Sequence, residues 1–192
     1  LLSVCLLVDR NIPVVWRGSM ASNALKQLIE QADWGELDYF LIDMPPGTSD
    51  IHLTLVQTLG ITGVVVVSTP QQVALADTRK GIAMFTDPKI NVPVLGIVEN
   101  MAWFTPESHP DERYYIFGNG GASRLADELG VKLLACIPLV AAVGVHSDEG
   151  EPVAAGDTIS AQAFIHLAHE VIDAVEDRNR DLPPTQNVKV KK

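Results

Sequence analysis

The stretch YFLIDMPPGTSD, residues 39–50, combines residue types that could hold a phosphate and its metal ion. Asp43 closes an apolar run, where a carboxylate suits Mg²⁺ bound through water, because hard cations prefer oxygen ligands and keep several waters. Gly47 lets the backbone approach a ligand, so that its N–H group could meet a terminal phosphate. Asp50 begins a helical pattern and is expected as its N-cap. Taken alone, Asp43 is better explained as a carboxylate in a turn; the whole string predicts a site for a nucleotide phosphate and its metal.

Short apolar runs predict the strands that would carry such a site. YFLID, GVVVVST and VPVLGIVEN have the continuous β-branched character of strands buried on both faces, and KLLACIP and SVCLLV are weaker candidates. Helical patterns separate these runs, which predicts an α/β fold: a three-layer, mostly parallel sheet with helices on both faces and right-handed crossovers. The expected strands are 3–8, 39–43, 63–69, 92–100 and 132–138, and the expected helices are 19–35, 50–60, 71–87, 119–130 and 159–177.

Polar residues collect at the carboxyl ends of the predicted strands, which is where ligands bind in parallel α/β sheets. One connection, residues 101–121, is also too long and irregular for an ordinary loop, and such loops in compact domains are usually functional. A ligand site is therefore expected at this edge of the sheet. The strand ends read Asp43-Met-Pro-Pro-Gly47, Ser68-Thr69-Pro70-Gln71, Glu99-Asn100-Met101 and Ile137-Pro138.

Composition limits the class of protein. A net charge of -10 and a pI near 4.8 argue against a nonspecific grip on nucleic acid or an anionic membrane, and no apolar run is long enough to span a bilayer. Cys5 and Cys136 lie far apart without a C-x-x-C pair, which favours a reducing, cytoplasmic compartment. We expect one domain over residues 1–177 and a disordered polar tail over 178–192.

Four collinear segments resemble one known family. VVWRGSMASNALKQLIEQADWGELDYFLIDMPPGTSD, VVVVSTPQQVALADTRKGIAMF, VLGIVENMAWF and YYIFGNGGASRLADELG are similar to the Mrp/ApbC-type ATPases. These are iron–sulfur cluster carriers within the deviant P-loop class that includes MinD and ParA. The resemblance runs from about Val14 to Val175, which makes it far more specific than any single motif.

The resemblance implies a homodimeric, Mg²⁺- and ATP-dependent hydrolase that passes an iron–sulfur cluster to apo-proteins. By that resemblance Asp43 and Gly47 are catalytic residues: Asp43 is the Walker B carboxylate that holds Mg²⁺ through water, and Gly47 belongs to the loop that senses the γ-phosphate. Asn100 matches the position whose amide reads the adenine edge, and Pro138 with its following loop flanks the base. Asn100 also has a simpler interpretation, as an amide in a turn after a strand.

The chain departs from the family pattern in two places. It contains no G-K-G-G-x-G-K-[ST] motif, so it resembles the C-terminal part of a longer protein and is not expected to hydrolyse ATP alone. The glycine-rich FGNGGAS has no lysine and is explained by close packing at a helix start. Residues 101–121 contain no cysteine, which counts against an iron–sulfur cluster on this segment and favours a solvated acidic loop. The alternative is a catalytically inactive paralogue that serves as a binding or dimerisation module.

Overall fold

The computed structural model describes residues 1–3, 19–48, 50–106, 108–109 and 111–187. The chain divides into two units, residues 1–60 with 186–192 and residues 61–185, and each is described by itself. Residues 4–8 of the predicted strand 3–8 lie outside the described residues.

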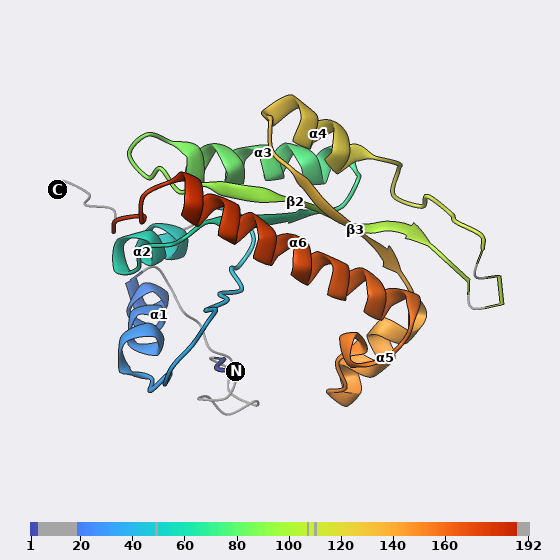
Figure 1. Ribbon diagram of the computed structural model, residues 1–192, viewed down its shortest axis with the longest axis horizontal. Helices are drawn as coiled ribbons and strands as arrows, with labels where there is room; N and C mark the ends of the chain where they lie inside the picture. The colour runs from blue at the N-terminus through green and yellow to red at the C-terminus, as the bar shows by residue number, and fades with distance from the viewer. Residues whose placement is uncertain (4–18, 49, 107, 110, 188–192) are drawn as a thin grey trace. The chain divides into compact units, whose positions relative to one another are not determined.

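A parallel sheet organises the second unit (Figure 1). It consists of β1 (Val64–Ser68), β2 (Val94–Phe104) and β3 (Leu133–Leu139), in the order β1-β2-β3, and both neighbouring pairs run parallel. These strands coincide with three of the predicted apolar runs. The predicted α/β class with a parallel sheet is therefore confirmed.

Helices cover both faces of this sheet, which confirms the predicted three layers (Figure 1). On one face α3 (Gln72–Thr86) and α4 (Gly121–Leu129) pack against β2, and Ile97 lies at the centre of that cluster with no exposed surface. On the other face α6 (Ile159–Asp181) packs through Phe164 and its neighbours. The second cluster comprises Val98, Leu134, Ala135, Ile137 and Ala174, with Ala163, Phe164, Leu167 and Val171 against it.

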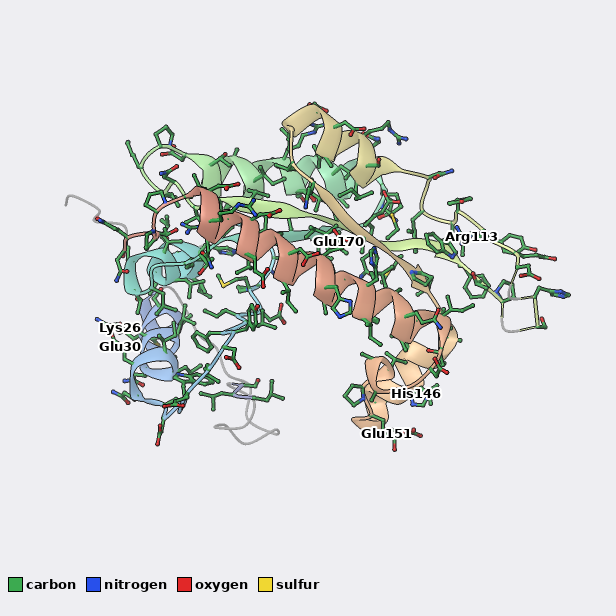
Figure 2. All side chains as sticks on the ribbon, in the orientation of Figure 1. Lys26, Glu30, Arg113, His146, Glu151 and Glu170 are labelled. Carbon is green, nitrogen blue, oxygen red and sulfur yellow. The ribbon has the colours of Figure 1, made fainter. Side chains whose placement is uncertain are left out.

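The long connection after β2 is partly ordered by pairing. β2 runs four residues past its predicted end to Phe104, whose backbone N–H and C=O both bond to Tyr114 at 2.8 and 2.9 Å in an antiparallel bridge. The Arg113 guanidinium lies 4.3 Å from the centre of the Trp103 ring, a cation–π contact on the same arm (Arg113 is labelled in Figure 2). The segment is thus a short arm built on β2 and not only a solvated acidic loop.

Two short helical elements of the second unit have no counterpart in the predicted elements. These are α5 (Ala141–Glu149) and the 3₁₀ turn η2 (Val153–Ala155). Neither contains a buried residue, so neither carries the apolar periodicity from which helices are predicted. No helix among the described residues has the length and apolar character needed to cross a membrane.

The first unit contains α1 (Ser19–Gln31) and α2 (Asp50–Thr58), both shorter forms of predicted helices. An exposed ion pair joins Lys26 and Glu30 one turn apart on α1, at 3.7 Å (Figure 2). After α1, the rings of Trp34 and Phe40 meet with centroids 4.7 Å apart.

The predicted strand at 39–43 is wrong. These residues form no strand, and Leu41 is 84% exposed. A strand is stable only when a neighbouring strand satisfies its backbone N–H and C=O groups. No strand lies among the described residues of the first unit, so this apolar run has no ladder to join.

Candidate functional site

The carboxyl ends of β1 and β3 lie beside Glu99 and Asn100 of β2 at one edge of the sheet in the second unit, and β2 runs on from this edge to Phe104. Ser68, Glu99 and Cys136 occupy one row across the sheet, since Ser68 pairs in register with Glu99 and Glu99 with Cys136. Ser68 and Glu99 are buried, at 6% and 3% exposure. The Ser68 hydroxyl accepts a hydrogen bond from Thr78 of α3 at 2.8 Å. Polar groups therefore gather at the strand ends, as the sequence predicts.

Asn100, which follows Glu99 on β2, is held in a defined orientation. Its Oδ1 accepts a hydrogen bond from the Met101 N–H at 3.0 Å, and only the oxygen of an amide side chain can accept. The Nδ2 group has no partner among the described residues and remains a donor. Met101 has a φ of 54°, a conformation that non-glycine residues rarely adopt and that often accompanies a functional site.

Pro138 lies beside Asn100, but the two side chains do not share a face. Ile137 is the register partner of Asn100, and Pro138 is the next residue on β3. Because successive side chains of a strand point to opposite faces, Asn100 shares its face with Ile137, while Pro138 points to the face of α3 and α4. Pro138 is buried there. The structure thus brings the two residues to neighbouring strand ends and separates their side chains.

A glycine-rich turn adjoins the same edge. Gly118 and Gly120 have φ angles of 102° and 64°, which favour glycine. A Cβ atom on Gly121 would lie 2.2 Å from the carbonyl oxygen of Pro70, so the turn packs directly on the residues that follow β1. Close packing is the role that the sequence predicts for this segment. The partner, Pro70, lies 51 residues before Gly121 and carries no sequence signal of the contact.

The predicted phosphate and metal residues lie in the first unit. Asp43 is exposed, and no described residue donates a hydrogen bond to its carboxylate or forms an ion pair with it. Gly47 is exposed, with a φ of 91°, and a Cβ added to it would meet no atom within 4 Å. Asp50 is the first residue of α2, where a carboxylate faces the positive end of the helix dipole.

Histidine and acidic side chains form one group with metal-ligand spacing in the part of the chain that the structure describes. His146, Glu149 and Glu151 place ligand atoms within 4.8 Å of one another at the end of α5, and Figure 2 labels His146 and Glu151. Both glutamates are exposed, and His146 already faces the Glu151 carboxylate at 3.6 Å. On the arm, Glu112 accepts a hydrogen bond from Tyr114, which raises the pKa of that phenol.

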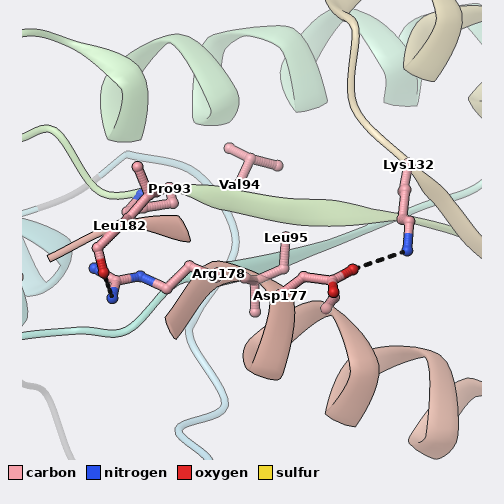
Figure 3. A pocket seen from close by; sticks show the side chains of 8 residues that line it. Pro93, Val94, Leu95, Lys132, Asp177, Arg178 and Leu182 are labelled. Carbon is pink, nitrogen blue, oxygen red and sulfur yellow. Dashed lines mark hydrogen bonds and ion pairs between the residues drawn. The ribbon is translucent and has the colours of Figure 1, made fainter. Parts of the chain in front are cut away.

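The amino ends of β2 and β3 carry a shallow cavity of about 220 Å³, shown in Figure 3. Lys132 and Asp177 form an ion pair at 3.7 Å beside it. The buried Arg178 side chain donates to the backbone oxygen of Pro183 and to Thr185, which ties down the chain after α6. This cavity lies at the end of the sheet opposite to the strand-end site. Its lining is Pro93, Val94, Leu95, Lys132, Ala174, Asp177, Arg178 and Leu182.

Cys136 lies in a surrounding that suppresses its thiolate. Burial, and secondly the charge of the neighbouring Glu99, raise the pKa of the Cys136 thiol above its ordinary value. The thiolate is the form that binds metals and reacts with electrophiles. Cys136 is therefore suited to packing and not to holding a cluster.

Slow alkylation of Cys136 is the expected consequence. In a Cys5→Ala background, the rate with iodoacetamide should rise with pH around a midpoint higher than that of the same chain unfolded in urea, because a raised pKa leaves less thiolate at each pH. Mass spectrometry of quenched samples measures the rate. A folded-state midpoint at or below the unfolded one would contradict the assignment.

Comparisons with known proteins place the chain in a family. A family model described as "ParA: NUBPL iron-transfer P-loop NTPase" matches residues 1–172. An iron–sulfur cluster carrier protein of Pseudomonas fragi is 48% identical over 165 residues, which is 86% of this chain and 56% of that protein. The chain spans about half the length of the curated relatives it matches.

Solved structures show the same likeness. A nucleotide-binding protein of Archaeoglobus fulgidus in complex with ADP is 41% identical, with a TM-score of 0.59 over 67% of this chain and 52% of that one. The cell division ATPase MinD of Pyrococcus furiosus is 25% identical, with a TM-score of 0.56 over 79% of this chain and 58% of that one. The resemblance to iron–sulfur carriers of the MinD and ParA class is thus confirmed.

Proposed function

We propose that this chain, which belongs to the ParA family of NUBPL-type iron-transfer P-loop NTPases, is the part of an ATP-dependent iron–sulfur assembly protein that carries the base-reading and metal-holding residues. The observation that carries the proposal is the Asn100 amide, fixed on β2 beside the end of β3, with its NH₂ group unpartnered among the described residues. The ADP complex of the Archaeoglobus relative supports a nucleotide as the ligand.

Each predicted site residue has a role in this proposal. Asn100 donates to a nitrogen acceptor of the adenine edge, and Pro138 bounds the neighbouring strand end. Gly47 offers its N–H to the γ-phosphate, and Asp43 holds Mg²⁺ through water. The exposed carboxylate of Asp43, unpaired among the described residues, fits a hard cation that keeps its waters. When bound, Mg²⁺ neutralises the charge that develops on the phosphate oxygens during transfer.

Phosphate binding also needs a P-loop, and none is encoded in these 192 residues. We propose that the chain is the C-terminal part of a longer cytoplasmic protein that supplies this loop and acts as a homodimer. The residues of this chain would then contribute nucleotide contacts, and ATP hydrolysis would belong to the complete protein. Reading the coding DNA upstream of Leu1 in all frames tests this directly.

The iron–sulfur cluster is the cargo of this proposal, passed to apo iron–sulfur proteins. Thiolates are its usual ligands, and residues 101–121 contain none. The half-buried Cys136, with its raised pKa, is also unsuited to the task. A cluster carried by the complete protein would therefore take its thiolates from outside residues 101–121.

Replacing Asn100 by alanine tests the base-reading role. In the complete protein, Asn100→Ala should weaken Mg²⁺-ATP binding up to about tenfold, because a net hydrogen bond contributes about 0.5–1.5 kcal/mol. Isothermal titration calorimetry measures the affinity, and Asn23→Ala, an exposed change on α1, is the matched control. Equal affinities of the two variants for Mg²⁺-ATP would show that Asn100 does not contact the nucleotide.

The absence of a P-loop motif from the sequence also supports a second candidate function, that of a catalytically inactive binding or dimerisation module. The two functions differ in one measurement. A complete protein that melts cooperatively but gives no heat of ATP binding in the presence of Mg²⁺ would establish the module and reject the ATPase.

A further inference from the structure

We propose that Glu99 is a positioning residue of the strand-end site, whose buried carboxylate holds the glycine-rich turn 118–121 against the end of β1 and the middle of β2. Glu99 is 3% exposed in the middle strand of the sheet. Its Oε2 accepts a hydrogen bond from the Ala122 N–H at 2.7 Å, across 23 residues of sequence. The bond therefore joins the strand that carries Asn100 to the turn that borders the same edge.

The acceptor replaces a missing helix cap. α4 begins at Gly121, and its N-cap residue, Gly120, has no side chain that could accept a hydrogen bond. The first N–H groups of a helix have no partner within it, and a buried one needs an acceptor from elsewhere. Glu99 supplies that acceptor to the fully buried Ala122, and its negative charge suits the positive end of the helix.

Close packing holds the turn from the other side. A Cβ on Gly121 would meet the Pro70 carbonyl oxygen at 2.2 Å and a Leu75 methyl carbon at 2.9 Å. The turn is therefore pressed on the segment between β1 and α3 while Glu99 binds it to β2. Without the carboxylate, the turn keeps the hydrogen bond from Arg124 to the Asn119 carbonyl oxygen within its own segment, and packing on Pro70 and Leu75 remains to hold it on the sheet.

This position gives Glu99 a part in nucleotide binding, an inference that rests on the proposed function. Asn100 follows Glu99 directly, and its amide orientation depends on the strained Met101 backbone next to it. Glu99 and Asn100 point to opposite faces of the sheet, so the turn held by Glu99 does not touch the amide and acts on it through the β2 backbone that the two residues share. Glu99 does not touch the nucleotide in this account and acts through the turn and the strand end.

Three substitutions separate positioning from charge in the complete protein. Glu99→Gln keeps an amide oxygen that can accept from Ala122, so its Kd for Mg²⁺-ATP should stay within about twofold of the parent. Glu99→Ala removes the acceptor, and Glu99→Asp keeps the charge but withdraws it by one methylene. Both should raise the Kd about tenfold. Glu176→Ala, the same chemical change at an exposed site on α6, should leave the Kd unchanged.

Amide hydrogen exchange supplies a readout independent of nucleotide. Exchange over residues 118–124 should quicken in Glu99→Ala and Glu99→Asp and remain slow in Glu99→Gln, with or without ATP. Circular dichroism checks that each variant folds, and Glu99→Asp carries the test if Glu99→Ala does not fold.

Several outcomes would overturn the proposal. Faster exchange over residues 118–124 with an unchanged Kd would show that Glu99 only caps the helix and has no part in nucleotide binding. Unchanged exchange in Glu99→Asp would show that the carboxylate does not hold the turn. A Kd in Glu99→Gln as weak as in Glu99→Ala would show that the hydrogen bond is not what positions the turn. If the complete protein without substitutions binds no ATP, the proposed function is rejected, and so is the part of Glu99 in nucleotide binding. The exchange pattern still shows whether Glu99 holds the turn.

Discussion

Replacing Asp43 by asparagine is expected to lower Mg²⁺-dependent ATP hydrolysis by the complete protein about 100-fold or more. Asparagine keeps the size of the side chain but removes the negative charge that holds the hydrated cation. The metal stabilises transition-state charge by several kcal/mol, and about 2.7 kcal/mol already corresponds to 100-fold in rate. Phosphate release at saturating ATP measures the effect, and raising the Mg²⁺ concentration should restore part of the rate.

Asp38→Asn is the matched control for this prediction. Asp38 is an exposed carboxylate in the same irregular segment, five residues before Asp43, and the same chemical change there should leave hydrolysis unchanged. Equal rates of hydrolysis for the two variants would show that the Asp43 carboxylate belongs to a turn and does not hold Mg²⁺. Loss of ATP binding together with hydrolysis would point to a damaged turn and not to a lost metal ligand.

The strands of the second unit can be predicted from the sequence because their apolar residues follow one another without interruption. The valines of β1 and the run from Gly96 to Glu99 in β2 are mostly apolar or small on both faces, a pattern that amphipathic helices do not show. Parallel order follows from the helical patterns between them. The carboxyl ends must then meet at one edge, which is why the sequence alone places Asn100 near the end of β3.

The errors arise where a structure depends on contacts distant in sequence. The run at 39–43 has strand composition, yet composition supplies no partner strand, and Leu41 is left exposed. In the sequence, Glu99 is only one polar residue at a strand end. Its role depends on Ala122, 23 residues on, which no local pattern connects to it. Side-chain direction is also hidden, because Asn100 and Pro138 both follow apolar runs but point to opposite faces of the sheet.

The largest effect on stability is expected at Ile97, where alanine should lower the free energy of unfolding by about 3 to 4 kcal/mol. Ile97 has no exposed surface and lies in the middle strand, against Leu75 and Leu125 of the two helices on that face. Deleting a buried aliphatic side chain loses its transfer free energy and leaves a cavity that closely packed neighbours fill only in part; Ile→Ala changes cost about 2–5 kcal/mol.

Urea unfolding followed by circular dichroism measures this loss as a lower midpoint with an unchanged m-value. Ile165→Ala is the matched control, because Ile165 is 43% exposed on α6 and the same truncation there should change the stability by no more than about 0.5 kcal/mol. Equal midpoints for the two variants would contradict the central place of Ile97 in the core. A loss at Ile97 as large as expected would be a substantial part of the roughly 5–15 kcal/mol that holds a typical domain folded, so this sheet would carry much of the stability of the unit that contains Asn100.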